Sequence, residues 1–102
     1  MNIFDEDKCK EWIASYIVPS RHGQVNHMHG EIGLRMMMQQ DTGVKVTRDE
    51  FRDLMMMEGY DPANLGASEW EFRISSKMLR QRPKSTYGGW MASNVDLLRR
   101  RA

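Results

Sequence analysis

Residues 44–51 read Val-Lys-Val-Thr-Arg-Asp-Glu-Phe, and this stretch decides the expected fold. Thr47 and Glu50 have the T-x-x-E spacing of a capping box. In that motif the threonine hydroxyl accepts a backbone N–H of the first helical turn, and the glutamate reaches back to the threonine N–H. The two valines before Thr47 alternate with a lysine, as in a short strand. The sequence therefore predicts a strand over residues 44–46 and a helix over residues 48–58.

Two further helices are expected before this stretch. Residues 4–18 carry apolar side chains at the spacing i, i+3, i+4, i+7 and i+8, and Pro19 ends this first helix. A second periodic run predicts a helix over residues 24–40. Gly30 and Gly33 weaken that second helix, and we expect another backbone to pack closely against them.

A half-buried strand is expected after the third helix. Residues 69–74 alternate between polar and apolar, so Trp70, Phe72 and Ile74 should face the core. Pairing with residues 44–46 would give a short antiparallel sheet, with residues 60–68 as a wing. Short helical turns are expected over residues 77–81 and 94–100.

The order of these elements predicts an α+β fold. We expect a small winged helix-turn-helix domain over residues 1–82, with three helices plus a short antiparallel sheet, and a basic C-terminal tail over residues 83–102. With 102 residues, of which 40% are hydrophobic and 28% charged, the chain is long enough for one domain with a modest core.

Three short motifs carry a resemblance to a known family. They are residues 46–51 with Met55, the turn at residues 59–62, and the aromatic segment at residues 70–75. Together they resemble the small winged-helix domains at the C-terminus of phage- and poxvirus-type primase-helicases, over Gln24 to about Ser76. The resemblance implies the fold, a viral origin and contact with nucleic acid. It implies no enzymatic activity, because the ATPase and primase parts are missing.

Charge is distributed unevenly along the chain. The formal net charge is +1, but residues 1–18 sum to −2, residues 19–72 to −4 and residues 73–102 to +7. A basic end of this kind suits a negatively charged partner, either DNA or RNA or an acidic protein surface. The alternative is a solvated tail without a partner.

Basic and aromatic residues form the candidate nucleic-acid-binding set. Arginines on the third helix could reach phosphates, whereas tail aromatics could stack on bases or pack on the domain instead. Residues 47–58 carry a net charge of −2, which argues against DNA reading by that helix. The set comprises Arg48, Arg52, Lys77, Arg80, Arg82, Lys84, Tyr87, Trp90, Arg99, Arg100 and Arg101.

Two methionine triplets, at residues 36–38 and 55–57, indicate a protein-binding surface. A helix cannot bury three consecutive side chains on one face, so each triplet should leave at least one methionine near the surface, while most of the six fill the core. The candidate protein-binding residues are Asp49, Asp53, Met37 and Met56.

Catalysis, metal and cofactor binding have no support in the sequence. His22, His27 and His29 have no evident further ligand besides Cys9 or Glu31, so we expect no metal site and no cofactor. The G-x-x-G at residues 30–33 carries an acid where a nucleic-acid clamp needs a base. Phosphate-binding loops and nucleophile elbows are missing, so we expect no enzyme.

These features lead to a functional hypothesis with one alternative. We expect a phage-type adaptor in the host cytoplasm that binds a host protein or nucleoprotein complex, as an anti-CRISPR inhibitor of host defence does. The alternative is a nucleic-acid-binding accessory protein that uses the tail and the wing. Apolar runs are too short to cross a membrane, so we expect no membrane partner. A homodimer is compatible with the sequence.

Overall fold

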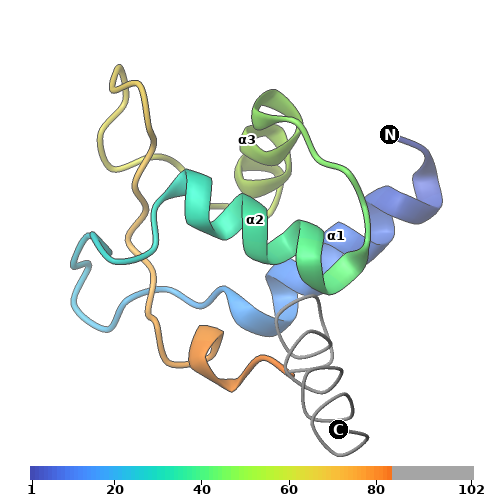
Figure 1. Cartoon of the computed structure of the whole chain (residues 1–102). Helices are drawn as coiled ribbons and strands as arrows, with labels where there is room; N and C mark the ends of the chain where they lie inside the picture. Colours follow the sequence, from blue (N-terminus) through green and yellow to red (C-terminus); the bar gives the residue numbers. More distant parts are fainter. Residues whose placement is uncertain (84–102) are drawn as a thin grey trace, which may run out of the picture.

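The computed structural model describes residues 1–83, and these form a small domain of three helices (Figure 1). The helices are α1 (Ile3–Tyr16), α2 (Glu31–Thr42) and α3 (Arg48–Met57), and a short 3-10 helix, η1 (Leu79–Gln81), follows. Each of the three α-helices packs against the other two. The chain between α3 and η1 first forms a loop and then an extended segment, residues 70–75, that runs past the start of α2.

Helix α1 confirms the first predicted helix. Asn2 caps it by accepting the N–H of Asp5 at 2.9 Å, and Asp5 and Glu6 in the first turn complement the helix dipole. The helix ends at Tyr16, two residues earlier than predicted and just ahead of Pro19. Its buried residues are Cys9, Trp12 and Ile13.

Helix α2 begins at Glu31, seven residues later than predicted. Asn26 provides the physical reason, because its side chain accepts the N–H groups of Met28 and His29 and so stabilises a turn that competes with a helix. Gly30 packs closely against a side chain, because an added Cβ would lie 2.7 Å from the Glu69 carboxylate, whereas the Trp70 carbonyl oxygen would lie at an ordinary 3.6 Å. The expected close approach of another backbone is therefore wrong at Gly30, and it is wrong at Gly33, which faces open space.

Helix α3 forms as the capping box predicts. The N–H of Glu50 donates to Thr47 Oγ1 at 3.2 Å, and the N–H of Thr47 donates to Glu50 Oε1 at 2.9 Å. Beyond the helix, Gly59 has a φ of +91°, and the Tyr60 N–H donates to the Met55 carbonyl at 2.8 Å, which is a Schellman ending. The predicted left-handed cap at Gly59 is therefore confirmed.

The two predicted strands do not form within residues 1–83, so the α+β prediction is wrong for this part of the chain. Around residues 44–46, side chains take the backbone groups: the Val46 N–H donates to Gln39 Oε1 at 2.8 Å, and Arg35 donates to the Val46 carbonyl at 3.2 Å. With these groups occupied, the segment has no strand partner. The described part is an all-α domain, and the wing over residues 60–68 lacks its sheet.

The backbone of residues 70–74 also makes its hydrogen bonds outside any strand. The Trp70 and Phe72 carbonyls accept from the N–H groups of Glu31 and Asn26, both at 2.9 Å, and Pro19 with Ile74 makes an isolated antiparallel bridge. The predicted alternation nevertheless holds for burial, because Phe72 and Ile74 lie in the core and Trp70 packs against it.

The core lies where the three helices meet the extended segment. Phe51 of α3 meets Phe72 edge to face, with ring centroids 6.4 Å apart, and Trp70 meets Phe72 in the same way at 6.3 Å. The turn predicted over residues 77–81 is shorter and is the 3-10 helix η1. The turn predicted over residues 94–100 and the basic tail lie outside the described residues, apart from the tail's first residue, Pro83.

Candidate interaction surfaces

The outward side of α3 is both acidic and apolar. Phe51, Leu54 and Met55 face the core, so the opposite side of the helix carries side chains spaced i, i+4 and i+7. These are Asp49, Asp53 and Met56, which we call the α3 stripe, and all three are exposed. Met56 is 49% exposed, and Met57 beside it is exposed as well. Three of the four predicted protein-binding residues therefore lie on one helix face.

The start of α1 adds more exposed apolar side chains next to α3. The amino group of Met1 lies 3.4 Å from Glu50 Oε2, so the beginning of the chain sits beside the first turn of α3. Ile3 and Phe4 lie two and three residues further along the chain, and Phe4 is 76% exposed. Large apolar side chains gathered at a surface are typical of a protein interface.

The fourth predicted protein-binding residue, Met37, does not join that face. Met38 is buried, and Met37 is partly buried and packs against the core. Met36 is the exposed member of this triplet, and Ile32 one helical turn earlier is exposed too. The prediction that each triplet leaves a methionine exposed is confirmed, but the exposed member here is not Met37. The expectation that most of the six fill the core is wrong, because Met36, Met56 and Met57 are exposed.

Arg52 points into the molecule instead of toward solvent. Its Nε and Nη2 donate to the two carboxylate oxygens of Glu31, with Nη2 at 2.8 Å from Oε1, and Nη2 also donates to the Ser68 carbonyl at 3.1 Å. The guanidinium carbon lies 4.3 Å from the ring centroid of Trp70. These contacts occupy the group that the sequence assigned to nucleic acid.

Glu31 is the buried anion of this cluster, with 1% of its surface exposed. Burial favours the neutral acid, but the hydrogen bonds from Arg52 and from the Trp70 N–H outweigh burial, so the pKa of Glu31 lies below its ordinary value. In turn, the hydrogen bond to Glu31 raises the pKa of Arg52. The pair is therefore charged at neutral pH.

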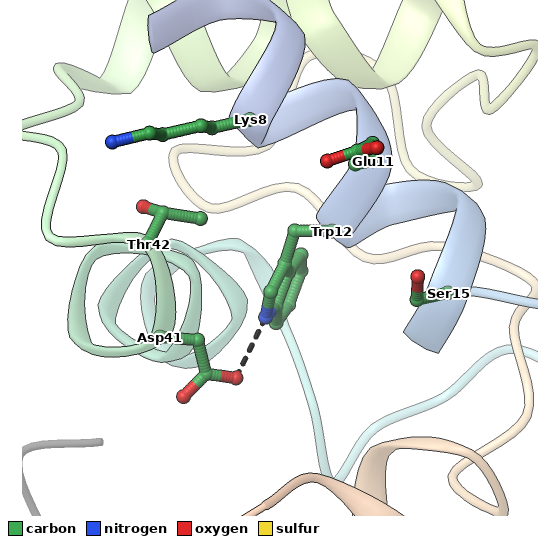
Figure 2. A pocket seen from close by; sticks show the side chains of 6 residues that line it. All are labelled: Lys8, Glu11, Trp12, Ser15, Asp41 and Thr42. Carbon is green, nitrogen blue, oxygen red and sulfur yellow. Dashed lines mark hydrogen bonds between the residues drawn. The ribbon is translucent and has the colours of Figure 1, made fainter. Parts of the chain in front are cut away.

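Arg82 is held in a similar way at the other end of α2. Its Nε and Nη2 lie 2.6 Å and 3.0 Å from the two oxygens of Asp41. Figure 2 shows the Trp12 indole N–H directed at the same carboxylate, at 2.7 Å. Asp41 and Trp12 border an open hollow of about 480 Å³ between α1 and the end of α2. Its other lining residues are Lys8, Glu11, Ser15 and Thr42.

Few of the predicted nucleic-acid-binding residues remain exposed in residues 1–83. Arg48 is exposed, but its Nε lies 3.6 Å from Asp49 Oδ1. Lys77 and Arg80, at and near η1, are exposed. The other six lie outside the described residues: Lys84, Tyr87, Trp90, Arg99, Arg100 and Arg101.

The histidines do not converge. The Nδ1 of His27 lies 2.8 Å from Glu71 Oε2, His22 is exposed, and His29 is partly buried. Burial lowers the pKa of His29, and the charges of Arg80 and Arg82 lower it further. Among residues 1–83, no group of three or more His, Cys, Asp or Glu side chains could hold a metal ion.

Sequence reasoning did not find the two buried carboxylates. One signal for Glu31 was available, because it lies at i, i+3 and i+7 with Leu34 and Met38, the buried residues of the same helix. An acid at a core position requires a buried cation, and Arg52 is that cation.

No match to this chain was found among protein-family models, curated proteins or solved structures. Its likeness to the primase-helicase winged-helix domains therefore stays a prediction. In residues 1–83 the longest α-helix, α1, is too short and too polar to cross a membrane.

Proposed function

We propose that this chain is a non-catalytic adaptor that binds a partner protein through the α3 stripe. The observation that carries the proposal is the arrangement of Asp49, Asp53 and Met56 along the side of α3 that faces away from the core. Carboxylates next to a flexible, polarisable apolar side chain suit a basic protein surface that has an apolar centre.

The charge of α3 favours a protein over a nucleic acid. Arg52 is neutralised by Glu31, and Arg48 lies next to Asp49. The outward surface of α3 is therefore negative, and phosphates repel such a surface. The helix-turn-helix order of α2 and α3 is then used for protein contact, and a basic host protein of a defence system, as in anti-CRISPR inhibition, is a partner of the expected kind.

Affinity capture with the full chain as bait tests the proposal. The test variant combines Asp53→Asn and Met56→Ser, which removes one charge and one apolar contact from the α3 stripe. The control variant is Leu65→Ser, because Leu65 is 80% exposed but lies in the loop after α3. We expect a partner retained by wild type and by the control variant to be lost at least about tenfold in the test variant. Equal retention by both variants would contradict the proposal.

The alternative, nucleic-acid binding, is favoured by one observation. Lys77 and Arg80 are both exposed, and the chain continues from there into its most basic part. Titration with duplex and single-stranded oligonucleotides at several salt concentrations separates the two functions. Affinity that falls steeply with salt and is weakened by Lys77→Gln with Arg80→Gln supports the alternative. Lack of binding at low salt excludes it.

A further inference from the structure

A groove lies at the start of α2. It is an open hollow of about 450 Å³ and lies where the turn at residues 27–30, the first turn of α2 and residues 67–71 come together (Figure 1). Backbone hydrogen bonds hold these segments in place, because the Glu31 N–H donates to the Trp70 carbonyl and the Asn26 N–H to the Phe72 carbonyl. The walls of the groove are thus fixed by the fold.

Small residues make this region hollow. Gly33 lines the groove, and a Cβ added there would meet no atom within 4 Å. Ala67 and Ser68 line it from the other segment. At Gly30 the missing side chain leaves space for the Glu69 carboxylate, whose Oε1 lies 2.7 Å from the position of a Cβ. Gly33 therefore provides room in the groove, and Gly30 provides the space that the Glu69 carboxylate occupies.

The walls of the groove combine apolar and anionic chemistry. Met28 and Ile32 line it with apolar side chains, and these residues are 72% and 51% exposed. Glu69 and Glu71 line it with carboxylates. Glu69 Oε1 accepts only a long hydrogen bond of 3.4 Å, from the Ile32 N–H, so it retains capacity for a donor.

The other charges near the groove leave it negative. The Arg52 guanidinium, which donates to the carbonyl of Ser68 in the lining, is neutralised by the buried Glu31. His27, whose Nδ1 lies 2.8 Å from Glu71 Oε2, is the remaining titratable side chain in the lining. An apolar wall beside two carboxylates matches a long aliphatic stem that ends in a cation.

We propose that this groove binds a lysine or arginine side chain of the partner protein. The aliphatic stem lies along Met28 and Ile32, over Gly33, and the cationic end reaches Glu69 and Glu71. The inference rests on the proposed function only in taking the partner to be a protein. It deepens that function, because it names the side-chain chemistry that the partner must present.

Titration of the full chain with small amides, followed by NMR, tests the inference. The probes are N-acetyl-arginine amide and N-acetyl-lysine amide, and the control probe is N-acetyl-norleucine amide, which has a similar stem without charge. We expect saturable shifts at the backbone amides of Gly30, Gly33 and Ser68, with a Kd on the order of millimolar for either cationic probe. The norleucine probe should bind at least about threefold more weakly. Equal binding of all three probes, or no saturable shift, overturns the inference.

Two pairs of variants test whether the probes bind in this groove. Gly33→Trp fills the groove and should abolish the shifts, whereas Gly33→Ala adds only a methyl group and should keep them. Glu69→Gln should weaken the arginine probe at least about threefold, whereas Glu58→Gln, an exposed carboxylate just after α3, should not. Unchanged binding in Gly33→Trp overturns the inference.

The α3 variant separates this inference from the proposed function. Asp53→Asn with Met56→Ser should lose the partner protein in affinity capture but keep the arginine titration unchanged. If capture depends on α3 and the probes do not bind, the inference fails while the proposed function stands. If the probes bind in the groove and capture does not depend on α3, the proposed function fails while the groove site stands.

Discussion

The two ends of α2 each carry a buried carboxylate, but the two are held in different ways. Glu31 is the first residue of the helix and Asp41 is next to its last. Each accepts two N–H groups from one arginine and one further N–H from a tryptophan, through the Trp70 backbone for Glu31 and the Trp12 indole for Asp41. These contacts are alike in kind, whereas the end of the helix and the position of the arginine differ.

The helix dipole favours one carboxylate and opposes the other. Partial positive charge at the N-terminal end of α2 stabilises Glu31, whereas partial negative charge at the C-terminal end repels Asp41. The arginines differ too, because Arg52 belongs to α3 and stacks on Trp70, while Arg82 follows the short η1. Glu31 thus joins α2 to α3 and to Trp70, whereas Asp41 joins α2 to α1 and to Arg82 just after η1.

Replacement of Glu31 should give the largest effect. Glu31→Ala leaves the Arg52 guanidinium partly buried without its anion and removes an acceptor from the Trp70 N–H. Loss of one partner from a buried pair costs about 3–5 kcal/mol of unfolding free energy. Urea unfolding followed by tryptophan fluorescence measures this loss. A loss below about 1 kcal/mol would mean that the two charges contribute little to the fold.

Replacement of Asp41 tests whether the two ends of α2 differ in stability. Asp41→Ala should cost about 2 kcal/mol, less than Glu31→Ala, because the helix dipole opposes the Asp41 charge and Arg82 can turn to solvent once it is released. Asp7→Ala, at an exposed position of α1, is the control and should change stability by less than about 0.5 kcal/mol. If Asp41→Ala were as costly as Glu31→Ala in the same urea experiment, the proposed asymmetry of α2 would be wrong.

The pH dependence of stability should reveal Glu31 as well. Its pKa is lower in the folded chain than in the unfolded chain, where it is about 4.5, so the unfolded state binds its proton first as the pH falls. The stabilisation is complete above that pH and is lost as the pH drops through the folded pKa. The free-energy difference between wild type and Glu31→Gln should therefore shrink below about pH 4.5. A difference that stays constant down to pH 3 would exclude this linkage.

Much of the helical structure was predictable because its signals are local. The capping box at Thr47 and Glu50 and the glycine at residue 59 define α3 through contacts within a few residues. The start of α2 was not predictable in this way, because the local turn that Asn26 makes with Met28 and His29 is also held by contacts almost 50 positions away, such as the bond from Asn26 to the Ile74 carbonyl at 3.1 Å. Periodicity alone extends the helix across that turn.

The predicted sheet failed for a related reason. Alternation of polar and apolar residues at 70–74 reports burial on one side, and that part of the prediction holds for Phe72 and Ile74. Alternation does not report which backbone groups are available as partners. Those near Val46 are taken by the side chains of Gln39 and Arg35, which sequence spacing did not indicate.

The candidate surfaces were predictable only in part, for a similar reason. Asp49, Asp53 and Met56 share a helix face by spacing alone, so their exposure followed once α3 was predicted. Arg52 lies on the same helix, but its direction depends on Glu31 and on the ring of Trp70, which are distant in sequence. The position of an arginine on its own helix therefore does not predict whether its side chain is exposed to solvent.

The smallest predicted effects concern the glycines at the start of α2, which should respond to alanine in opposite directions. Gly33→Ala adds a methyl group in open space inside a helix, so it should stabilise the chain by up to about 1 kcal/mol. Gly30→Ala should destabilise it by about 1 kcal/mol, because alanine is a poor N-cap and its Cβ would displace the Glu69 carboxylate. Thermal unfolding of the two variants side by side gives the sign of each change. If both variants gained stability, the contact of Glu69 with Gly30 would contribute nothing to the fold. The fold would then not hold the Glu69 carboxylate in the groove, where we expect it to meet a cation of the partner.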